Sequence, residues 1–139
     1  MFTGNSKWCF LGIVAISAWV LGSAVQAEAE DLKSRLISTA TKVETFKIDD
    51  QEGHIVGTYE RKGLMLHDNG EVANELNRGI FDNVGGVGKW QGYCLQTFKD
   101  GSTMMMKHQG TNVKGQIAEA SFEFIKGTGR FEGIKGGGT

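Results

Sequence analysis

The sequence predicts an all-β domain made of antiparallel strands, closed into a barrel or folded as a sandwich. Glycine accounts for 21 of the 139 residues and proline for none, and the glycines separate segments rich in valine, isoleucine, phenylalanine, tyrosine and threonine. Apolar and polar residues alternate within those segments, and no helical pattern lies between them. A closed barrel is favoured because it removes exposed sheet edges, which this proline-free chain cannot block with proline.

The first 27 residues have the pattern of a cleavable secretory signal helix. A short polar start carries Lys7, an apolar run follows over 8–21, and small residues lead to Ala27. Cleavage after Ala27 or Ala29 would satisfy the peptidase. The apolar run is shorter than the roughly 20 residues that cross a bilayer, so we expect no membrane association after cleavage. The mature protein is therefore expected in the periplasm or outside the cell.

The segment 28–43 is predicted to be a leader or a short amphipathic helix. Its apolar residues Leu32, Leu36, Ile37 and Val43 lie at spacings that a helix could use. The β domain then covers 44–139. Its strands are expected at 44–48, 54–66, 71–84, 93–98, 103–108, 116–125 and 130–134, with glycine-rich loops between them.

The hairpin around residues 99–102 sets the predicted interior. Asp100-Gly101 suits a two-residue turn, which pairs Phe98 with Thr103 and Leu95 with Met106. Side chains alternate across a strand, so this register places one largely apolar set on a single face. That candidate interior consists of Tyr93, Leu95, Thr97, Met104, Met106 and His108.

Two further segments complete the sheet. Residues 116–125 alternate between apolar side chains and acidic or hydroxyl side chains, as a strand with one wet face does. The glycine-rich residues 126–131 are predicted to turn the chain back antiparallel to this strand. The other glycine-rich stretch, 84–89, is expected to be a loop between strands, because no helix follows it to hold a phosphate.

The residues Gly127-Thr128-Gly129-Arg130-Phe131-Glu132-Gly133-Ile134-Lys135-Gly136 resemble the Gly-Thr-Gly-x-Phe-x-Gly-x-x-Gly signature of allene oxide cyclases, dirigent proteins and small secreted bacterial relatives. The resemblance implies an eight-stranded, lipocalin-like antiparallel barrel whose interior can hold a small apolar molecule. Those families continue into further strands after the signature. We therefore expect the barrel to lack its last strand or to be completed by a neighbouring chain, with an open edge or a homodimer as the result.

Residues that could carry chemistry are few. Three histidines, His54, His67 and His108, have no metal-ligand spacing, and Cys94 is best interpreted as a small buried residue. Met104, Met105 and Met106 could bind copper(I), but alternation divides them between two faces, which favours an ordinary core or an apolar pocket. Glu60 could face the interior as an acid or belong to a solvated strand end. No catalytic, metal or cofactor site is assigned.

Two functions of different classes remain. The near-neutral net charge of −1 gives no sign of a nucleic-acid partner. The first hypothesis is a non-catalytic exported barrel with Tyr93, Leu95, Met104, Met106 and His108 inside, which binds a small apolar ligand through these residues or serves as a structural envelope protein. The alternative is a cyclase or isomerase that acts on an apolar substrate inside the barrel, as the resemblance allows.

Overall fold

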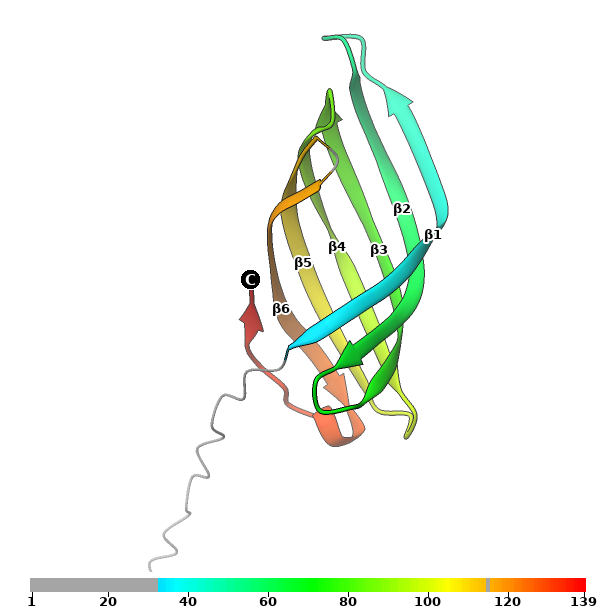
Figure 1. The fold of residues 1–139 in the computed structure, drawn as a ribbon, viewed down its shortest axis with the longest axis vertical. Coiled ribbons are helices and arrows are strands. Elements are labelled where there is room, and N and C mark those ends of the chain that lie inside the picture. Colours follow the sequence, from blue (N-terminus) through cyan, green and yellow to red (C-terminus); the bar gives the residue numbers. More distant parts are fainter. Residues whose placement is uncertain (1–32, 115) are drawn as a thin grey trace, which may run out of the picture. The chain divides into compact units, whose positions relative to one another are not determined.

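Residues 33–114 and 116–139 of the computed structural model are described below, and they form one antiparallel sheet (Figure 1). The strands follow one another in chain order, each paired with its neighbours. The predicted all-β class is confirmed. The elements are β1 (Ser34–Lys47), β2 (His54–His67), β3 (Val72–Val84), β4 (Val87–Phe98), β5 (Thr103–Val113), β6 (Gln116–Thr128), the 3₁₀ turn η1 (Gly129–Phe131) and β7 (Gly137–Gly138).

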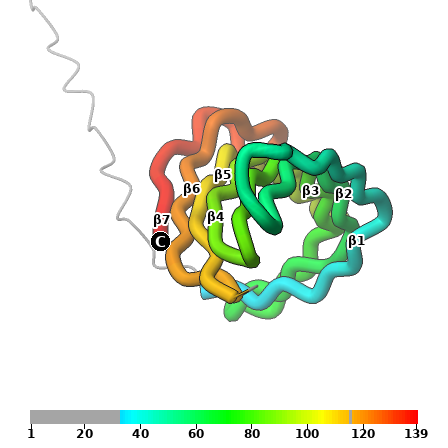
Figure 2. The backbone as a smooth tube through the Cα atoms, turned by 90° about the horizontal axis from the view of Figure 1, so that it is seen from above, coloured from blue at the N-terminus to red at the C-terminus, as the bar shows by residue number. Residues whose placement is uncertain are grey.

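The sheet curls around a central space without closing (Figure 2). Among the described residues no ladder joins β1 to β6 or β7, so the expected closed barrel is wrong, and so is a two-sheet sandwich. The reason lies after β6, where the chain forms η1 and the short β7 in place of a long strand. β7 pairs only with Phe122 and Glu123.

The segment that was expected to be a leader or short helix is a strand from Ser34 onward. β1 pairs with β2 along its whole length, apart from a bulge between Ala40 and Lys42. Ile37, Thr39, Thr41 and Val43 are β-branched, which lowers helix propensity and favours a strand. Helical spacing of a few apolar residues was therefore a weaker signal than β-branching. The predicted signal peptide, 1–27, lies outside the described residues.

The β4–β5 hairpin corrects the predicted register by one residue. Phe98 N–H donates to the Ser102 carbonyl and Gly101 N–H donates to the Phe98 carbonyl, so the loop is longer than two residues. Thr97 therefore pairs with Thr103, and Leu95 with Met105. A slip of one residue moves every side chain of a strand to the opposite face. Cys94, Gln96 and Phe98 share the inner face with Met104 and Met106, rather than Tyr93, Leu95 and Thr97.

Glycines also form turns between other strands. Asn69-Gly70 lies between β2 and β3, where Gly70 N–H donates to the His67 carbonyl. In the stretch 84–89, Gly85 and Gly86 have φ values of 58° and 83° between the paired residues Val84 and Val87. Positive φ at both central residues is the requirement of a tight hairpin turn, which explains the two glycines. β4 accordingly begins six residues earlier than the strand predicted at 93–98.

The strand expected at 130–134 is a turn instead. Glu132 N–H donates to the Gly129 carbonyl and Ile134 N–H to the Phe131 carbonyl, and Gly129 and Gly133 have positive φ. These glycines bend the chain where an extended strand would need φ near −120°. The chain still returns antiparallel to β6, as predicted, but through β7.

The apolar core lies at the η1 end of the curled sheet. Ala73, Phe98 and Met104 are buried there, and Phe131 and Ile134 from the C-terminal turn pack against them. The guanidinium of Arg130 lies over the Phe98 and Phe131 rings and pairs with Glu71 and Asp100 at 2.6 and 3.3 Å. The core is confined to this end, so the opposite half of the curl keeps a hollow interior.

Candidate functional site

Aromatic side chains on the inner face lie over glycines of neighbouring strands. A Cβ atom at Gly57 would come within 2.6 Å of the Phe81 ring, and one at Gly110 within 2.4 Å of the Trp90 ring. A Cβ atom at Gly79 would be 2.4 Å from the Tyr59 hydroxyl. In each case the glycine is the cross-strand partner of the aromatic residue. Glycine at these positions therefore lets large rings lie flat along the sheet and leaves the interior open.

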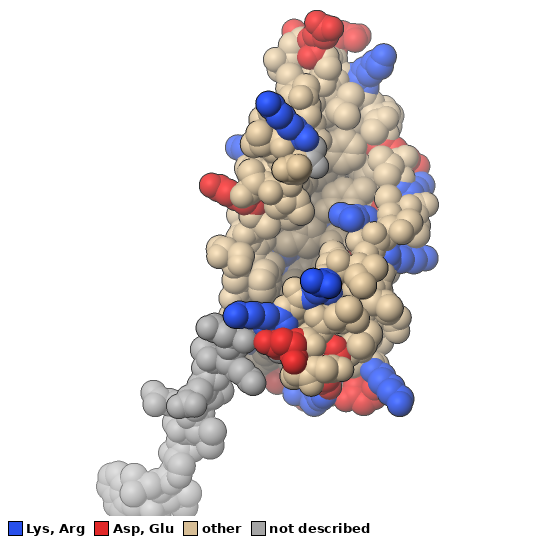
Figure 3. Space-filling model, in the orientation of Figure 1, with Lys and Arg blue, Asp and Glu red and all other residues tan. Residues whose placement is uncertain are grey.

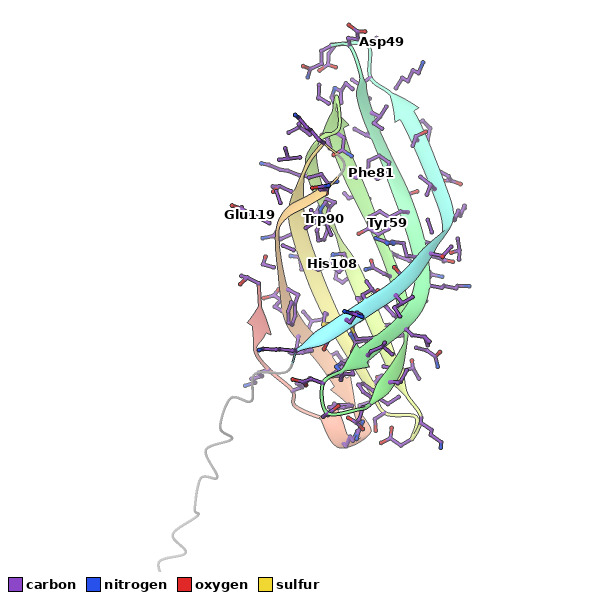
Figure 4. All side chains as sticks on the ribbon, viewed as in Figure 1. Asp49, Tyr59, Phe81, Trp90, His108 and Glu119 are labelled. Atoms are coloured by element: carbon purple, nitrogen blue, oxygen red, sulfur yellow. The ribbon has the colours of Figure 1, made fainter. Side chains whose placement is uncertain are left out.

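A cavity of about 1240 Å³ lies along this aromatic row. The centre of its wall is a line of directly paired residues that crosses the five strands β2 to β6: Gly57, Phe81, Trp90, Gly110 and Ala120. Most of the other lining residues are chain neighbours of these five. Tyr59, Phe81, Trp90 and His108 project into the curl (Figure 4). The face of the molecule between β1 and β6 is hollowed, with lysine and arginine side chains around the hollow (Figure 3). The cavity is larger than the 300–1,000 Å³ typical of small-molecule sites.

A chain of polar side chains crosses the inner face below the aromatic row. His108 Nε2 lies 2.9 Å from Asn77 Oδ1, and Asn77 Nδ2 donates to Glu75 Oε1 at 3.5 Å. Glu75 is only 4% exposed, and its second oxygen, Oε2, has no hydrogen-bond partner among the described residues. Burial raises the pKa of Glu75 and lowers the pKa of His108. Both groups are thus shifted toward their neutral forms.

Six other buried polar atoms of this face also lack a partner in the described part of the chain. They are Ser38 Oγ, His67 Nε2, Asn83 Oδ1, Trp90 Nε1, Gln96 Oε1 and His108 Nδ1. An unsatisfied buried polar group lowers the free energy of unfolding by about 1–3 kcal/mol, so several on one face are unusual in a small domain. Such atoms are expected where a protein forms hydrogen bonds to a bound molecule.

The thiol of Cys94 and the phenol of Tyr59 are affected by the same burial. Burial raises the pKa of Tyr59 to about 12 and also raises the pKa of Cys94, with the nearby Glu75 carboxylate adding to the effect on Cys94. A thiol that stays protonated is neither a nucleophile nor a metal ligand. Cys94 is therefore a packing residue, as the sequence suggested, and it is the only cysteine of the described residues.

The structure separates the five residues predicted to bind a ligand. Met104 and Met106 are buried on the inner face, and His108 lies on the same face. Met105 points to the other face, as alternation predicted. Tyr93, 51% exposed, and Leu95 lie on the outer face because of the corrected register. The expected shared interior of all five is therefore wrong, while ligand binding by any of them stays a prediction.

The residues with the most distinctive chemistry were not singled out from the sequence. Ala73, Glu75 and Asn77 are every second residue of β3 and all point inward, so a correct face assignment of β3 would have identified Glu75 and Asn77. Trp90 precedes the strand predicted at 93–98, so the predicted alternation assigned it to neither face. The candidate acid Glu60 instead lies on the outer face, where its carboxylate pairs with Arg78 at 2.8 Å and its pKa is lowered by that contact.

Residues 33–114 and 116–139 contain no group of three or more histidine, cysteine or acidic side chains placed to hold a metal ion. In the same ranges, no helix has the length and apolar character needed to cross a bilayer.

Comparison with known proteins gives no relative. No protein-family model, curated protein or solved structure matches this chain. The functional argument therefore rests on the residues of the curl themselves.

Proposed function

We propose that this protein is an exported, non-catalytic binding protein that holds a small, mainly apolar molecule inside its curled sheet. The observation that carries the proposal is the cavity of about 1240 Å³ beside Phe81 and Trp90. Aromatic walls contribute most of the contact energy to small ligands, and a few polar groups orient them. The unpartnered atoms of Trp90, His108 and Glu75 supply such polar groups on the same face.

The remaining parts of the proposal come from the sequence. Export rests on the signal pattern of residues 1–27. A relation of this open sheet to the lipocalin-like allene oxide cyclases rests on the glycine motif at 127–136, and the consecutive antiparallel order of six long strands is compatible with it. An incomplete cylinder of this kind would admit a ligand through the gap between β1 and β6.

Titration with N-phenylnaphthylamine, a neutral apolar dye that fluoresces when it leaves water, tests the binding function. The full chain should bind the dye saturably. Ala120→Trp, which puts a large ring into the cavity lining, should weaken binding at least tenfold. Lys126→Trp, an equal change on the outer face of the same strand, should leave binding unchanged. Equal affinities for the wild type and the Ala120 variant would exclude the cavity as the binding site.

A cyclase or isomerase is the second candidate, and the buried carboxyl of Glu75 favours it. A carboxyl group with a raised pKa can donate a proton at neutral pH, which is what a general acid in an apolar cavity must do. Asn77 holds one oxygen and leaves the other unpartnered. The resemblance to allene oxide cyclases gives apolar epoxides as the substrates to test.

Glu75→Gln distinguishes the two candidates. If the protein is an isomerase, the wild type should convert an apolar epoxide and the variant should lose at least a hundredfold in turnover while still binding the dye. Rearrangement would be followed by chromatography, since isomerisation leaves the mass unchanged. Absence of turnover in the wild type, with dye binding intact, would leave the non-catalytic function.

A further inference from the structure

The hydrogen-bond chain on the inner face determines which nitrogen of His108 carries the proton. Asn77 Nδ2 donates to Glu75 Oε1, which fixes the orientation of the Asn77 amide. Its oxygen therefore faces His108 Nε2 at 2.9 Å and must accept a hydrogen bond from it. Because burial lowers the pKa of His108, the ring is neutral near pH 7 and carries this one N–H. Nδ1 is then a free acceptor.

Trp90 offers the complementary group beside this acceptor. The indole N–H is a hydrogen-bond donor only, and it has no acceptor among the described residues. The Trp90 and His108 rings lie 5.2 Å apart, centroid to centroid, tilted by 54°. Trp90 also lines the cavity, whereas Asn77 and Glu75 lie behind His108 in the chain. Trp90, at the cavity wall, and the neighbouring ring of His108 thus carry one donor and one acceptor that have no partner among the described residues.

We propose, building on the binding function above, that the ligand of this protein is an apolar alcohol whose hydroxyl group accepts a hydrogen bond from Trp90 Nε1 and donates one to His108 Nδ1. A hydroxyl is the smallest group that does both. An ether, a ketone or a carboxylate only accepts, so each would leave the His108 lone pair unpaired and facing an oxygen lone pair. The alternative, a hydrocarbon, would leave both groups unsatisfied.

Binding must also move Trp90. Both nitrogen atoms are screened from solvent, so a hydroxyl reaches them only when the indole turns away from Gly110, over which it lies. A ligand hydroxyl that bridges the two rings therefore changes the environment of the indole as well as the hydrogen bonding of His108 Nδ1. A ligand held elsewhere in the cavity changes neither.

Octanol and its isomer heptyl methyl ether provide a matched pair of probes for calorimetry on the full chain. The two have the same atoms and almost the same volume, and only octanol can donate. We expect octanol to bind about tenfold or more tightly than the ether. Trp90→Phe and His108→Phe keep a ring at each position but remove the donor or the acceptor, so each variant should bind octanol and the ether with affinities equal to one another.

Two results would overturn the inference in different ways. If the wild type binds octanol and the ether equally, the hydroxyl site is wrong and the cavity remains a binding site. If the wild type binds neither probe nor the dye, the binding function itself is wrong. Nitrogen NMR of His108 gives a readout that needs no variant: octanol, but not the ether, should shift the Nδ1 resonance. An unchanged resonance with octanol bound would place the hydroxyl elsewhere.

Discussion

Cys94 illustrates how the face of a strand decides the chemistry of a residue. An exposed cysteine in an exported protein invites oxidation or pairing between chains. In the corrected register Cys94 points inward, 4% exposed, beside Glu75. Desolvation and a neighbouring carboxylate both disfavour the thiolate, so the pKa of the thiol lies above its ordinary range.

We therefore expect Cys94 to be unreactive in the folded protein. In a Cys9→Ala background, which leaves Cys94 as the single cysteine, a thiol-specific disulfide reagent should react at least a hundredfold more slowly in buffer than in strong denaturant. The matched variant Tyr93→Cys, in the Cys9→Ala, Cys94→Ala background, places a thiol one residue away on the outer face and should react rapidly when folded. Rapid reaction of native Cys94 would contradict the inward assignment.

A single residue of register also explains what the sequence could and could not predict. Periodicity identified β2, β3, the β4–β5 hairpin and the inward methionines, because alternation is a local property. The loop length at 99–102 depends on which backbone atoms bond, and Asp-Gly fits both a two-residue turn and the observed longer one. Assuming a two-residue turn assigned the side chains of β4 to the wrong faces, so the inward position of Gln96 beside its cross-strand partner Glu75 was not predicted.

At the scale of elements, His54 connects the β1–β2 loop to β3. Its Nδ1 lies 2.6 Å from Asp50 Oδ1 and its Nε2 2.9 Å from Asp82 Oδ1, so a protonated ring donates to two carboxylates. The two hydrogen bonds raise the pKa of His54, and the contact with His54 lowers the pKa of Asp50. This clamp fastens the loop end of the hairpin, which lies at the opposite end from the apolar core.

The clamp predicts a stability that falls as the solution becomes alkaline. A raised histidine pKa contributes stability that is complete below the unfolded value of 6.5 and is lost as pH rises through the folded pKa. The lowered Asp50 pKa contributes above its ordinary 3.8 and is lost only in stronger acid. Between about pH 6 and pH 8 the wild type should therefore lose more thermal stability than His54→Gln, as measured by circular dichroism. Parallel pH profiles would exclude the clamp.

The core at the η1 end makes a different kind of contribution, through the burial of apolar side chains. Phe98 is 5% exposed, lies 4.7 Å from Phe131 by ring centroids and touches the Met104 cluster. Phe98→Ala should cost about 3–5 kcal/mol of unfolding free energy in a urea titration. Phe46→Ala removes the same side chain from β1, where it is 64% exposed, and should cost within about 0.5 kcal/mol. Similar losses at both positions would show that the core extends beyond this end.

For the whole molecule, the open sheet leaves two long edges to account for. Within residues 33–114 and 116–139, β1 has a ladder on one side only, and β6 is covered by β7 only at Phe122 and Glu123. Edge strands with apolar side chains recruit other strands, and β1 presents Ile37 and Phe46 more than half exposed. The sequence predicted this open edge from the resemblance, but which strands remain uncovered depends on long-range pairing.

Pairing of β1 with a second copy is the simplest way to satisfy this edge. Two identical edges that run antiparallel about a twofold axis form a closed dimer, whereas β1 of one copy on β6 of the next would grow into a chain. Size-exclusion chromatography with light scattering should show a concentration-dependent dimer, and Ile37→Lys or Phe46→Lys should shift it to monomer. Ile80 is also about half exposed, but it lies on β3, which is paired on both sides, so Ile80→Lys should leave the dimer intact. A wild type that stays monomeric at its highest soluble concentration would show that the β1 edge remains unpaired in solution. Assemblies larger than a dimer would indicate that β1 of one copy pairs with β6 of the next.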